Sequence, residues 1–370
     1  MSKLHNLAAV GQSVWIDSLS REILRSGGLA RQIEQNAVSG VTSNPTIFAK
    51  AMLSGDDYDE QVSELVARDA GTDEIYATLV TTDIQQACDI MLPTYERTGG
   101  ADGFVSVEVA PTLARDTEGT IAEAREWSKR VNRPNLLVKV PATAEGVPAI
   151  RQLISEGISI NVTLIFSLAR YEEVMEAYIA GIEQYQATGG DASRVASVAS
   201  FFVSRVDSEV DPRLEAIGTE EALALRGTAA VANAQVAYLR FLRSFTTDRW
   251  LALAAGGSRV QQPLWASTST KNPGYSDTLY VDTLAAPTTV NTMPESTIAA
   301  YQDHGPEYPD ILDVVQMASA NATLAALAAV GIDYEDVTET LEREGVEKFA
   351  ASFAEMVSDI DRKRQALLDG

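Results

Sequence analysis

The stretch Asn135-Leu136-Leu137-Val138-Lys139-Val140-Pro141-Ala142-Thr143 places one lysine inside an otherwise apolar run that ends in a turn. Such a run is typical of a parallel strand covered on both faces, where a charged ammonium is penalised unless it is paired or neutral. Burial therefore favours the neutral amine of Lys139, which is a nucleophile toward carbonyl carbons. The alternative is a snorkelling or salt-bridged lysine at a strand end, without a chemical role.

Composition narrows the class of protein. The 370 residues suffice for two ordinary domains or for one α/β barrel with insertions, since such barrels usually have about 250 residues. We find no apolar run of the roughly 18 residues that a membrane span needs, and no signal-peptide pattern at the N-terminus. With a single cysteine, Cys88, an intrachain disulfide is excluded, and we predict a cytoplasmic protein.

Charge narrows the class of partner. A net charge of −23 disfavours nucleic acid and anionic membranes, and two histidines with one cysteine provide no zinc cluster. We therefore expect a small-molecule partner, no nucleic acid and no membrane, with any anion site built locally.

Short apolar runs alternate with longer amphipathic segments, which indicates repeated strand–helix units. We predict a (β/α)8 TIM-type barrel with additional helices, as a single domain over residues 1–370. Its C-terminal helical extension begins at about residue 309. The eight strand candidates are 13–17, 40–44, 103–109, 135–140, 158–165, 195–203, 260–266 and 280–292.

Helices are predicted between these strands and after them. Segment 208–227 is longer than a strand–helix connection needs, so we expect extra helix there, with Asp211-Pro212 marking a loop. The tail from residue 334 repeats apolar residues at helical spacing, which predicts a helix packed on the barrel and a possible homodimer contact. The clearest helix candidates are 74–95, 121–131, 147–155, 168–186 and 220–245.

Successive side chains on a strand point to opposite faces, and the same division recurs in four predicted strands. Branched apolar residues occupy one face, where they pack under the outer helices, and polar residues occupy the other. The polar face looks inward, close to the carboxyl ends of the strands, where barrel enzymes keep their catalytic groups. The residues on it are Asp17, Ser106, Glu108, Lys139, Ser159, Asn161 and Thr163.

Each of these residues has a structural explanation on its own. Asp17 could cap the following helix, Glu108 could be a lone strand-end carboxylate, and Asn161 or Thr163 could join neighbouring strands. Together they would be several buried polar groups on one face and at one end, each costing about 1–3 kcal/mol without a partner. A shared active site is the simpler explanation.

The quoted segments of this chain resemble the transaldolases, in particular the longer bacterial form, over residues 15–294. The Thr-Ser-Asn-Pro-Thr and Asn-x-Thr-Leu-x-Phe-Ser pieces, in this order around a strand lysine, are the most specific. The matching segments are Val14-Trp15-Ile16-Asp17-Ser18-Leu19-Ser20-Arg21, Gly40-Val41-Thr42-Ser43-Asn44-Pro45-Thr46-Ile47-Phe48, Ser106-Val107-Glu108-Val109, the Lys139 strand, Ile160-Asn161-Val162-Thr163-Leu164-Ile165-Phe166-Ser167 and Leu264-Trp265-Ala266-Ser267-Thr268-Ser269-Thr270-Lys271-Asn272-Pro273.

The resemblance implies a Schiff-base enzyme of the pentose phosphate pathway that needs no metal or cofactor. It would move a dihydroxyacetone unit from sedoheptulose 7-phosphate to glyceraldehyde 3-phosphate, forming erythrose 4-phosphate and fructose 6-phosphate. Lys139 would form the imine, and its protonated form would accept the electrons of the breaking C–C bond. Asp17 would be the base on the hydroxyl group, and Glu108 would exchange protons with the carbinolamine through a water molecule.

The resemblance also implies a substrate pocket. Asn44, Asn161, Thr163 and Ser200 match positions that hold the ketose and the water. Arg205 should bind the phosphate, together with Ser267. Where shorter relatives carry a second arginine, this chain has Lys271. The lysine ammonium acts on a phosphate as a point charge, whereas an arginine guanidinium can donate two parallel hydrogen bonds to it. The alternative for Lys271 is a solvated loop lysine.

Two other functions remain open from the sequence. One is a fructose-6-phosphate aldolase-like activity on the same Schiff base that releases dihydroxyacetone, although those relatives are much shorter. The other is a catalytically silent barrel that binds sugar phosphates. The combination of Asp17, Glu108 and Lys139 argues against a silent barrel, since a protein that only binds sugar phosphates has no need for a buried uncompensated lysine.

Overall fold

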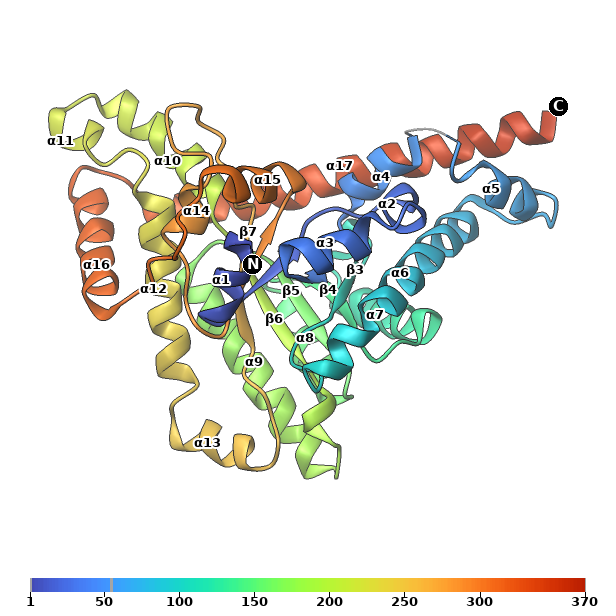
Figure 1. Ribbon diagram of the computed structural model, residues 1–370, viewed down its shortest axis with the longest axis horizontal. Helices are drawn as coiled ribbons and strands as arrows, with labels where there is room; N and C mark the ends of the chain where they lie inside the picture. Colours follow the sequence, from blue (N-terminus) through green and yellow to red (C-terminus); the bar gives the residue numbers. More distant parts are fainter. Residues whose placement is uncertain (1, 54–55, 370) are drawn as a thin grey trace.

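The protein is a closed barrel of eight parallel strands in the order β1-β2-β3-β4-β5-β6-β7-β8 (Figure 1), which confirms the predicted fold. The computed structural model describes residues 2–53 and 56–369. Its strands are β1 Gln12–Ile16, β2 Val38–Val41, β3 Val105–Glu108, β4 Leu136–Pro141, β5 Ile160–Ile165, β6 Ser197–Phe202, β7 Gln262–Ala266 and β8 Thr289–Met293.

Helices surround the barrel and extend beyond it. Each strand is followed by at least one helix before the next strand begins. The helices are α1 Lys3–Ala9, α2 Arg21–Arg25, α3 Gly28–Asn36, α4 Pro45–Leu53, α5 Asp59–Val66, α6 Thr72–Arg97, α7 Thr117–Val131, α8 Gly146–Ser155, α9 Leu168–Ala187, α10 Ser204–Ile217, α11 Glu220–Leu223, α12 Ala229–Ser244, α13 Asp248–Ala255, α14 Leu279–Asp282, α15 Glu295–His304, α16 Val314–Ala329 and α17 Tyr334–Asp369.

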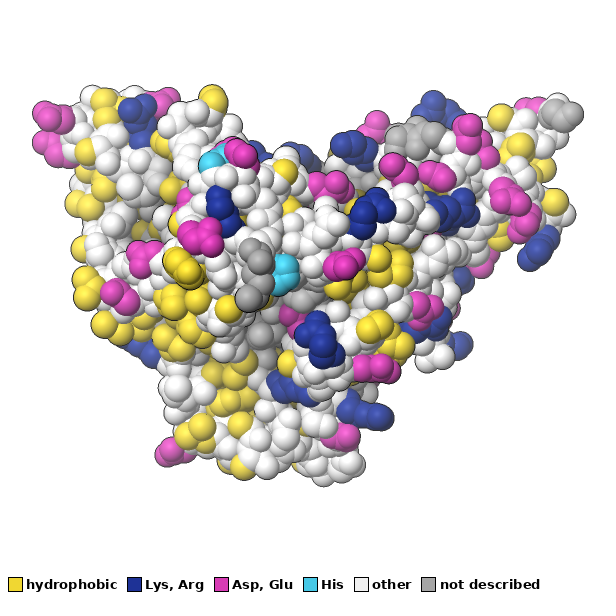
Figure 2. Space-filling model, in the orientation of Figure 1, with side chains coloured by type: hydrophobic (Ala, Val, Ile, Leu, Met, Phe, Trp, Pro, Cys, Tyr) yellow, Lys and Arg dark blue, Asp and Glu magenta, His cyan; other side chains and the backbone are white. Residues whose placement is uncertain are grey.

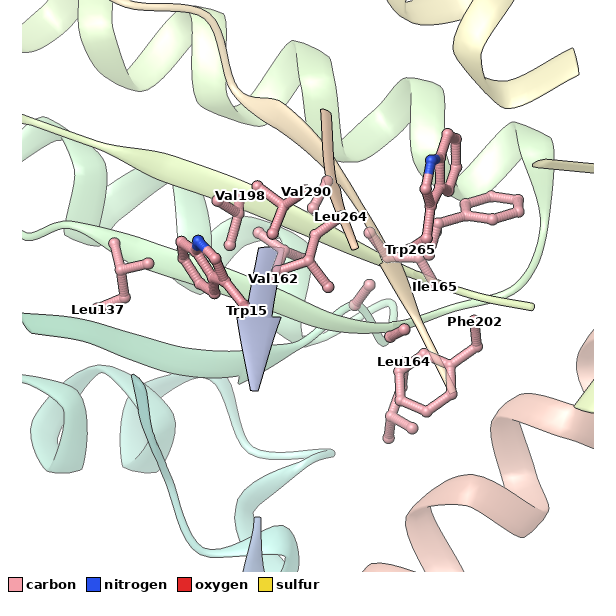
Figure 3. Close-up of a cluster of buried hydrophobic side chains, with 14 of the residues drawn as sticks. Trp15, Leu137, Val162, Leu164, Ile165, Val198, Phe202, Leu264, Trp265 and Val290 are labelled. Atoms are coloured by element: carbon pink, nitrogen blue, oxygen red, sulfur yellow. The ribbon is translucent and has the colours of Figure 1, made fainter. Parts of the chain in front are cut away.

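The barrel interior toward the amino ends of the strands is filled by apolar side chains. Trp15 pairs in register with Gly40 on β2, and a Cβ on that glycine would lie 2.4 Å from the indole ring. The interior at this level therefore has room for the tryptophan only because residue 40 has no side chain. Figure 3 shows Trp15 in this core, together with Leu137, Val198, Leu264 and Val290.

Three expected boundaries are wrong. The segment 280–292 is not one strand: its first residues form α14, and β8 begins only at Thr289. The expected helix 220–245 is divided into α11 and α12 by Gly227, which has a φ of 71°. Pro212 lies inside α10 rather than in a loop.

The helix α17 crosses the carboxyl end of the barrel (Figure 1). A Cβ on its Gly345 would lie 3.0 Å from the side chain of Leu164 on β5, so the helix backbone approaches the strand ends closely. Hydrogen bonds hold it at both sides, from Arg213 of α10 to Asp336 at 2.5 Å and from Thr46 of α4 to Ser352 at 2.9 Å. The expected packing of this tail on the barrel is confirmed.

In the space-filling view the upper edge of the molecule dips between the part built from α10 and α11 and the part built from α5 and the end of α17 (Figure 2). Within the described residues, no helix by itself has the length and apolar composition to cross a membrane. The pair α16 and α17, bent by 95° where they meet, passes that test only when the two are taken together.

Candidate active site

A pocket of about 290 Å³ opens at the carboxyl ends of the strands, below α17. Its floor is formed by strand-end residues and its upper wall by Lys348 and Phe349 of the helix. The residues expected from the sequence that line it are Asp17, Asn44, Lys139, Ser200, Arg205, Ser267 and Lys271.

Lys139 lies at the bottom of this pocket and is 5% exposed. Its Nζ atom lies 3.4 Å from Oε2 of Glu108, and it donates a hydrogen bond of 3.2 Å to the carbonyl oxygen of Ser43. The lysine is therefore compensated by a carboxylate, so an unpaired buried charge cannot be used to argue against a silent barrel. Lys139 still differs from a snorkelling lysine, because its side chain is only 6% exposed and lines a pocket. Glu108, Asn161 and Thr163 are buried beside the pocket and do not line it.

Glu108 is the partner that can exchange protons with Lys139. Burial raises the pKa of Glu108, while the ammonium group of Lys139 opposes that shift. The two residues are directly paired in the strand register, which fixes them at the same height in the barrel. A carboxylate this close to an amine is placed to accept a proton from it and to return one.

A polar network crosses the barrel beside this pair. Asn161 donates to the hydroxyl of Ser106 at 3.0 Å and accepts from Ser200 at 2.7 Å. The strands β3 and β5 are not neighbours, so the Asn161–Ser106 bond spans the interior, as the expected inward face requires. Thr163 is fully buried, and its hydroxyl has no hydrogen-bond partner among the described residues, which leaves it available to a ligand or water.

Asp17 follows β1 and lies on the opposite side of the pocket. Its Oδ1 atom accepts a hydrogen bond of 2.7 Å from Thr42, and Thr42 is 2.7 Å from the hydroxyl of Thr292. Asp17 does not cap α2, because the side chain of Ser20 does so. Thr42 and Thr292 were not singled out from the sequence, although Thr42 lies within the motif that contains Asn44.

Asn44 caps the helix α4. Its side-chain oxygen accepts from the backbone N–H of Ile47 at 3.0 Å. This bond orients the amide and leaves its nitrogen as a donor toward the pocket.

Ser267 adopts a left-handed conformation at the end of β7, with a φ of 56°. Its hydroxyl lies 3.0 Å from that of Ser204, and its carbonyl oxygen accepts from the backbone N–H of Ser204 at 3.1 Å. These bonds hold the strained residue at the first turn of α10. Strain of this kind persists only where the surroundings determine it, and it is frequent at ligand sites.

Arg205 is held between two aromatic rings. Its guanidinium carbon lies 5.0 Å from the ring centre of Phe202 and 5.6 Å from that of Phe349 on α17. Burial lowers the pKa of Arg205 from its very high ordinary value, which leaves it charged near neutral pH. The rings fix the direction of a long side chain that would otherwise lose rotamer entropy on binding.

Three cations meet at the pocket, and one of them was missed in the sequence. Lys348 of α17 lines the pocket with Arg205 and Lys271. No pattern singles it out, because a lone lysine on an amphipathic helix is usually a solvated residue. Desolvation first, and then the charges of Arg205 and Lys348, lower the pKa of Lys271.

None of these three cations forms a salt bridge with another described residue. In a chain of net charge −23, these three cations line this cavity with a single carboxylate, Asp17, and this excess of positive charge favours an anion site. A phosphate dianion fits this arrangement, because both lysine and arginine bind phosphate oxygens.

Comparison with known proteins points in the same direction. Residues 14–360 match the family model described as Transaldolase/Fructose-6-phosphate aldolase. The chain is 55% identical over 359 residues to a protein named Transaldolase from Acidothermus cellulolyticus, covering 97% of this chain and 96% of the relative. It is 53% identical over 366 residues to a Transaldolase from Thermobifida fusca, covering 99% and 98%. A Transaldolase from Mycolicibacterium smegmatis is 54% identical over 351 residues, covering 95% and 94%.

Proposed function

The chain belongs to the transaldolase/fructose-6-phosphate aldolase family, and we propose that Lys139 is the Schiff-base lysine of its transaldolase activity. The enzyme transfers a dihydroxyacetone unit between sugar phosphates. The observation that supports Lys139 is its position: it is buried in the barrel, paired with Glu108 at 3.4 Å, and lies at the floor of the pocket.

Imine formation uses the pair of Lys139 and Glu108. Glu108 takes a proton from the ammonium, and the free amine attacks the ketone carbon of the donor sugar. The resulting carbinolamine loses its hydroxyl group as water when Glu108 returns a proton through a bound water molecule. The orphaned hydroxyl of Thr163 and the amide of Asn161 are the groups that hold this water and the ketose.

Cleavage of the C–C bond uses Asp17. The carboxylate removes the proton of the ketose hydroxyl that becomes the aldehyde, and the electrons of the breaking bond move into the protonated imine. The aldehyde leaves, and the enamine attached to Lys139 attacks the carbonyl carbon of the acceptor, whose oxygen takes the proton back from Asp17. Water then hydrolyses the resulting imine, which releases the new ketose and the amine of Lys139. Thr42 orients Asp17 through its hydrogen bond of 2.7 Å. Asn44 and Ser200 also line the pocket, where they bind the sugar hydroxyls.

Arg205, Ser267, Lys271 and Lys348 bind the phosphate. The overall charge repels the substrate at long range, so attraction comes from these donors at short range, with screening beyond about 8 Å at physiological salt. Arg205 contributes most because its fork of donors is desolvated between Phe202 and Phe349.

The central experiment is borohydride reduction in the presence of fructose 6-phosphate, followed by peptide mass spectrometry. We expect one three-carbon unit on the peptide that contains Lys139, and none on the Lys139→Met variant. An adduct on another lysine would refute the assignment.

The reaction products separate transaldolase from the alternatives. Fructose 6-phosphate with erythrose 4-phosphate should give sedoheptulose 7-phosphate, whereas an aldolase-like activity would release dihydroxyacetone. A silent barrel would give neither product and no adduct.

A further inference from the structure

Lys271 lies between two cavities of opposite character. The substrate pocket is on one side, and a second cavity of about 260 Å³ is on the other; Lys271 lines both. The second cavity is lined by carboxylates of α10, namely Asp207, Asp211 and Glu215. A lysine on a flexible stem therefore has two competing places, one beside the substrate phosphate and one beside these carboxylates.

We propose that Tyr275 is a positioning residue that keeps Lys271 in the substrate pocket. It does so in two ways: it satisfies Asp211, the carboxylate that would otherwise attract the lysine, and it anchors the loop 267–278 to α10. This inference rests on the proposed contact between Lys271 and phosphate.

The hydrogen bonds of Asp211 support the first role. Its Oδ2 atom accepts from the hydroxyl of Tyr275 at 2.6 Å, and its Oδ1 atom accepts from the backbone N–H of Gly227 at 2.9 Å. Asp211 is 7% exposed. Both oxygens of this buried carboxylate have a donor, so it does not need an ammonium partner.

The backbone around Gly227 is shaped for the ring of Tyr275. Gly227 has a φ of 71°, and a Cβ there would lie 2.8 Å from the tyrosine ring. A side chain at position 227 would strain the backbone and push the ring away from Asp211. The connection between α11 and α12 therefore contributes to the same anchor.

Hydrogen bonds within the loop 267–278 connect the position of Tyr275 to that of Lys271. The hydroxyl of Thr270 donates to the carbonyl oxygen of Ser276 at 2.8 Å, and the backbone N–H of Tyr275 donates to the carbonyl oxygen of Asn272 at 3.1 Å. Lys271 lies inside the short closed segment that these bonds form. Because Arg205 and Asp211 belong to the same helix α10, the anchor also holds Lys271 at a constant distance from Arg205.

Removing the tyrosine hydroxyl should release the lysine. In Tyr275→Phe, Asp211 stays buried but loses one donor, which leaves an oxygen unsatisfied. Lys271 lines the same cavity and can supply the missing donor by turning away from the substrate pocket. The phosphate then loses a cation although no residue of the pocket has been changed.

The test compares two reactions in four proteins. One reaction uses fructose 6-phosphate and erythrose 4-phosphate; the other uses dihydroxyacetone and glyceraldehyde, which carry no phosphate. We expect Tyr275→Phe to lower kcat/KM for the phosphorylated pair about 3–10-fold, mainly through KM, and to leave the other reaction unchanged. In a Lys271→Met background the same change should have no further effect, since the lysine on which it acts is gone.

Tyr280→Phe is the matched control. Tyr280 donates a hydrogen bond of 2.8 Å to Asp207 on the same helix, one turn before Asp211, but it does not lie in the loop 267–278. Tyr280→Phe removes a donor from another carboxylate of the same cavity but leaves the loop 267–278 anchored. A smaller loss on the phosphorylated pair than in Tyr275→Phe therefore measures the part of the effect that comes from the loop anchor. Gly227→Ala is a second way to displace the ring, and it should reproduce the effect of Tyr275→Phe while the hydroxyl is still present.

Four results would overturn the inference. Equal losses on both substrate pairs would make Tyr275 a purely structural residue, and so would an unchanged kcat/KM on both. Additive effects of Tyr275→Phe and Lys271→Met would show that the tyrosine does not act through the lysine. If Lys271→Met itself left the phosphorylated reaction unchanged, the proposed phosphate contact would fail first, and the positioning role would fail with it.

Discussion

The three pocket cations should contribute to phosphate binding in the order of their burial. Arg205 is half-buried between two rings, whereas Lys271 and Lys348 are exposed residues on a loop and on α17. A hydrogen bond to a charged group contributes about 1.5–3 kcal/mol when desolvated, and an exposed ion pair about 0.2–1 kcal/mol. These energies correspond to about 10–200-fold and about 1.4–5-fold in kcat/KM. Lys271 ranks between Arg205 and Lys348 because its ammonium is partly desolvated.

Replacing each cation by methionine keeps the apolar stem and removes the charge. For fructose 6-phosphate we expect kcat/KM to fall about 10–200-fold in Arg205→Met and about 10-fold in Lys271→Met, whose ammonium is partly desolvated. In Lys348→Met the expected loss is about 1.4–5-fold. The Lys348 effect should also disappear at 1 M salt, where the screening length falls from about 10 Å to about 3 Å.

The assay measures kcat/KM for the phosphorylated and the unphosphorylated substrate pairs at 0.1 M and at 1 M salt. Lys129→Met on α7 removes the same charge from an exposed residue that does not line the pocket, and it controls for net charge. Equal losses for all three cations, or a Lys348 effect that persists at high salt, would contradict the ordering by burial. A comparable loss on the unphosphorylated pair would show that the residue supports the fold instead.

Three further predictions concern the two carboxylates proposed to be catalytic, an acid-sensitive residue and the barrel core. Asp17→Asn should still form a reducible imine while C–C cleavage falls about 10²–10⁴-fold, whereas Glu108→Gln should slow imine formation itself; equal trapping rates in both variants and the wild type would contradict this division. Burial raises the pKa of Asp207 to about 6, so the folded state binds a proton more tightly than the unfolded state, and lowering the pH from 7 to 4 should stabilise the wild type by up to about 3 kcal/mol relative to Asp207→Asn. Urea denaturation at both pH values measures this difference, and identical pH profiles would refute it. In the core, Gly40→Ala should reduce the free energy of unfolding by about 1–3 kcal/mol, because the added Cβ would lie 2.4 Å from the ring of Trp15; an unchanged urea midpoint would contradict this.

The sequence alone determined the barrel and the residues that point into it. Alternation along a strand is a local property, so the face shared by Glu108, Lys139 and Asn161 follows from residue numbers once the strands are recognised. The network from Ser106 through Asn161 to Ser200 agrees with that face. The sequence pattern gave a wrong prediction at 280–292, where apolar and polar residues do not alternate as in a strand. The first part of this segment is the helix α14.

Only the tertiary structure decided what surrounds these groups. The pairing of Glu108 with Lys139 depends on the register of β3 against β4, which no single strand specifies. Lys348 and Phe349 reach the pocket because α17 crosses the barrel, and Tyr275 reaches Asp211 because a loop after β7 folds back on α10. Such contacts join residues far apart in the chain, and their energy depends on distance and burial. Neither quantity can be read from a residue's neighbours in sequence.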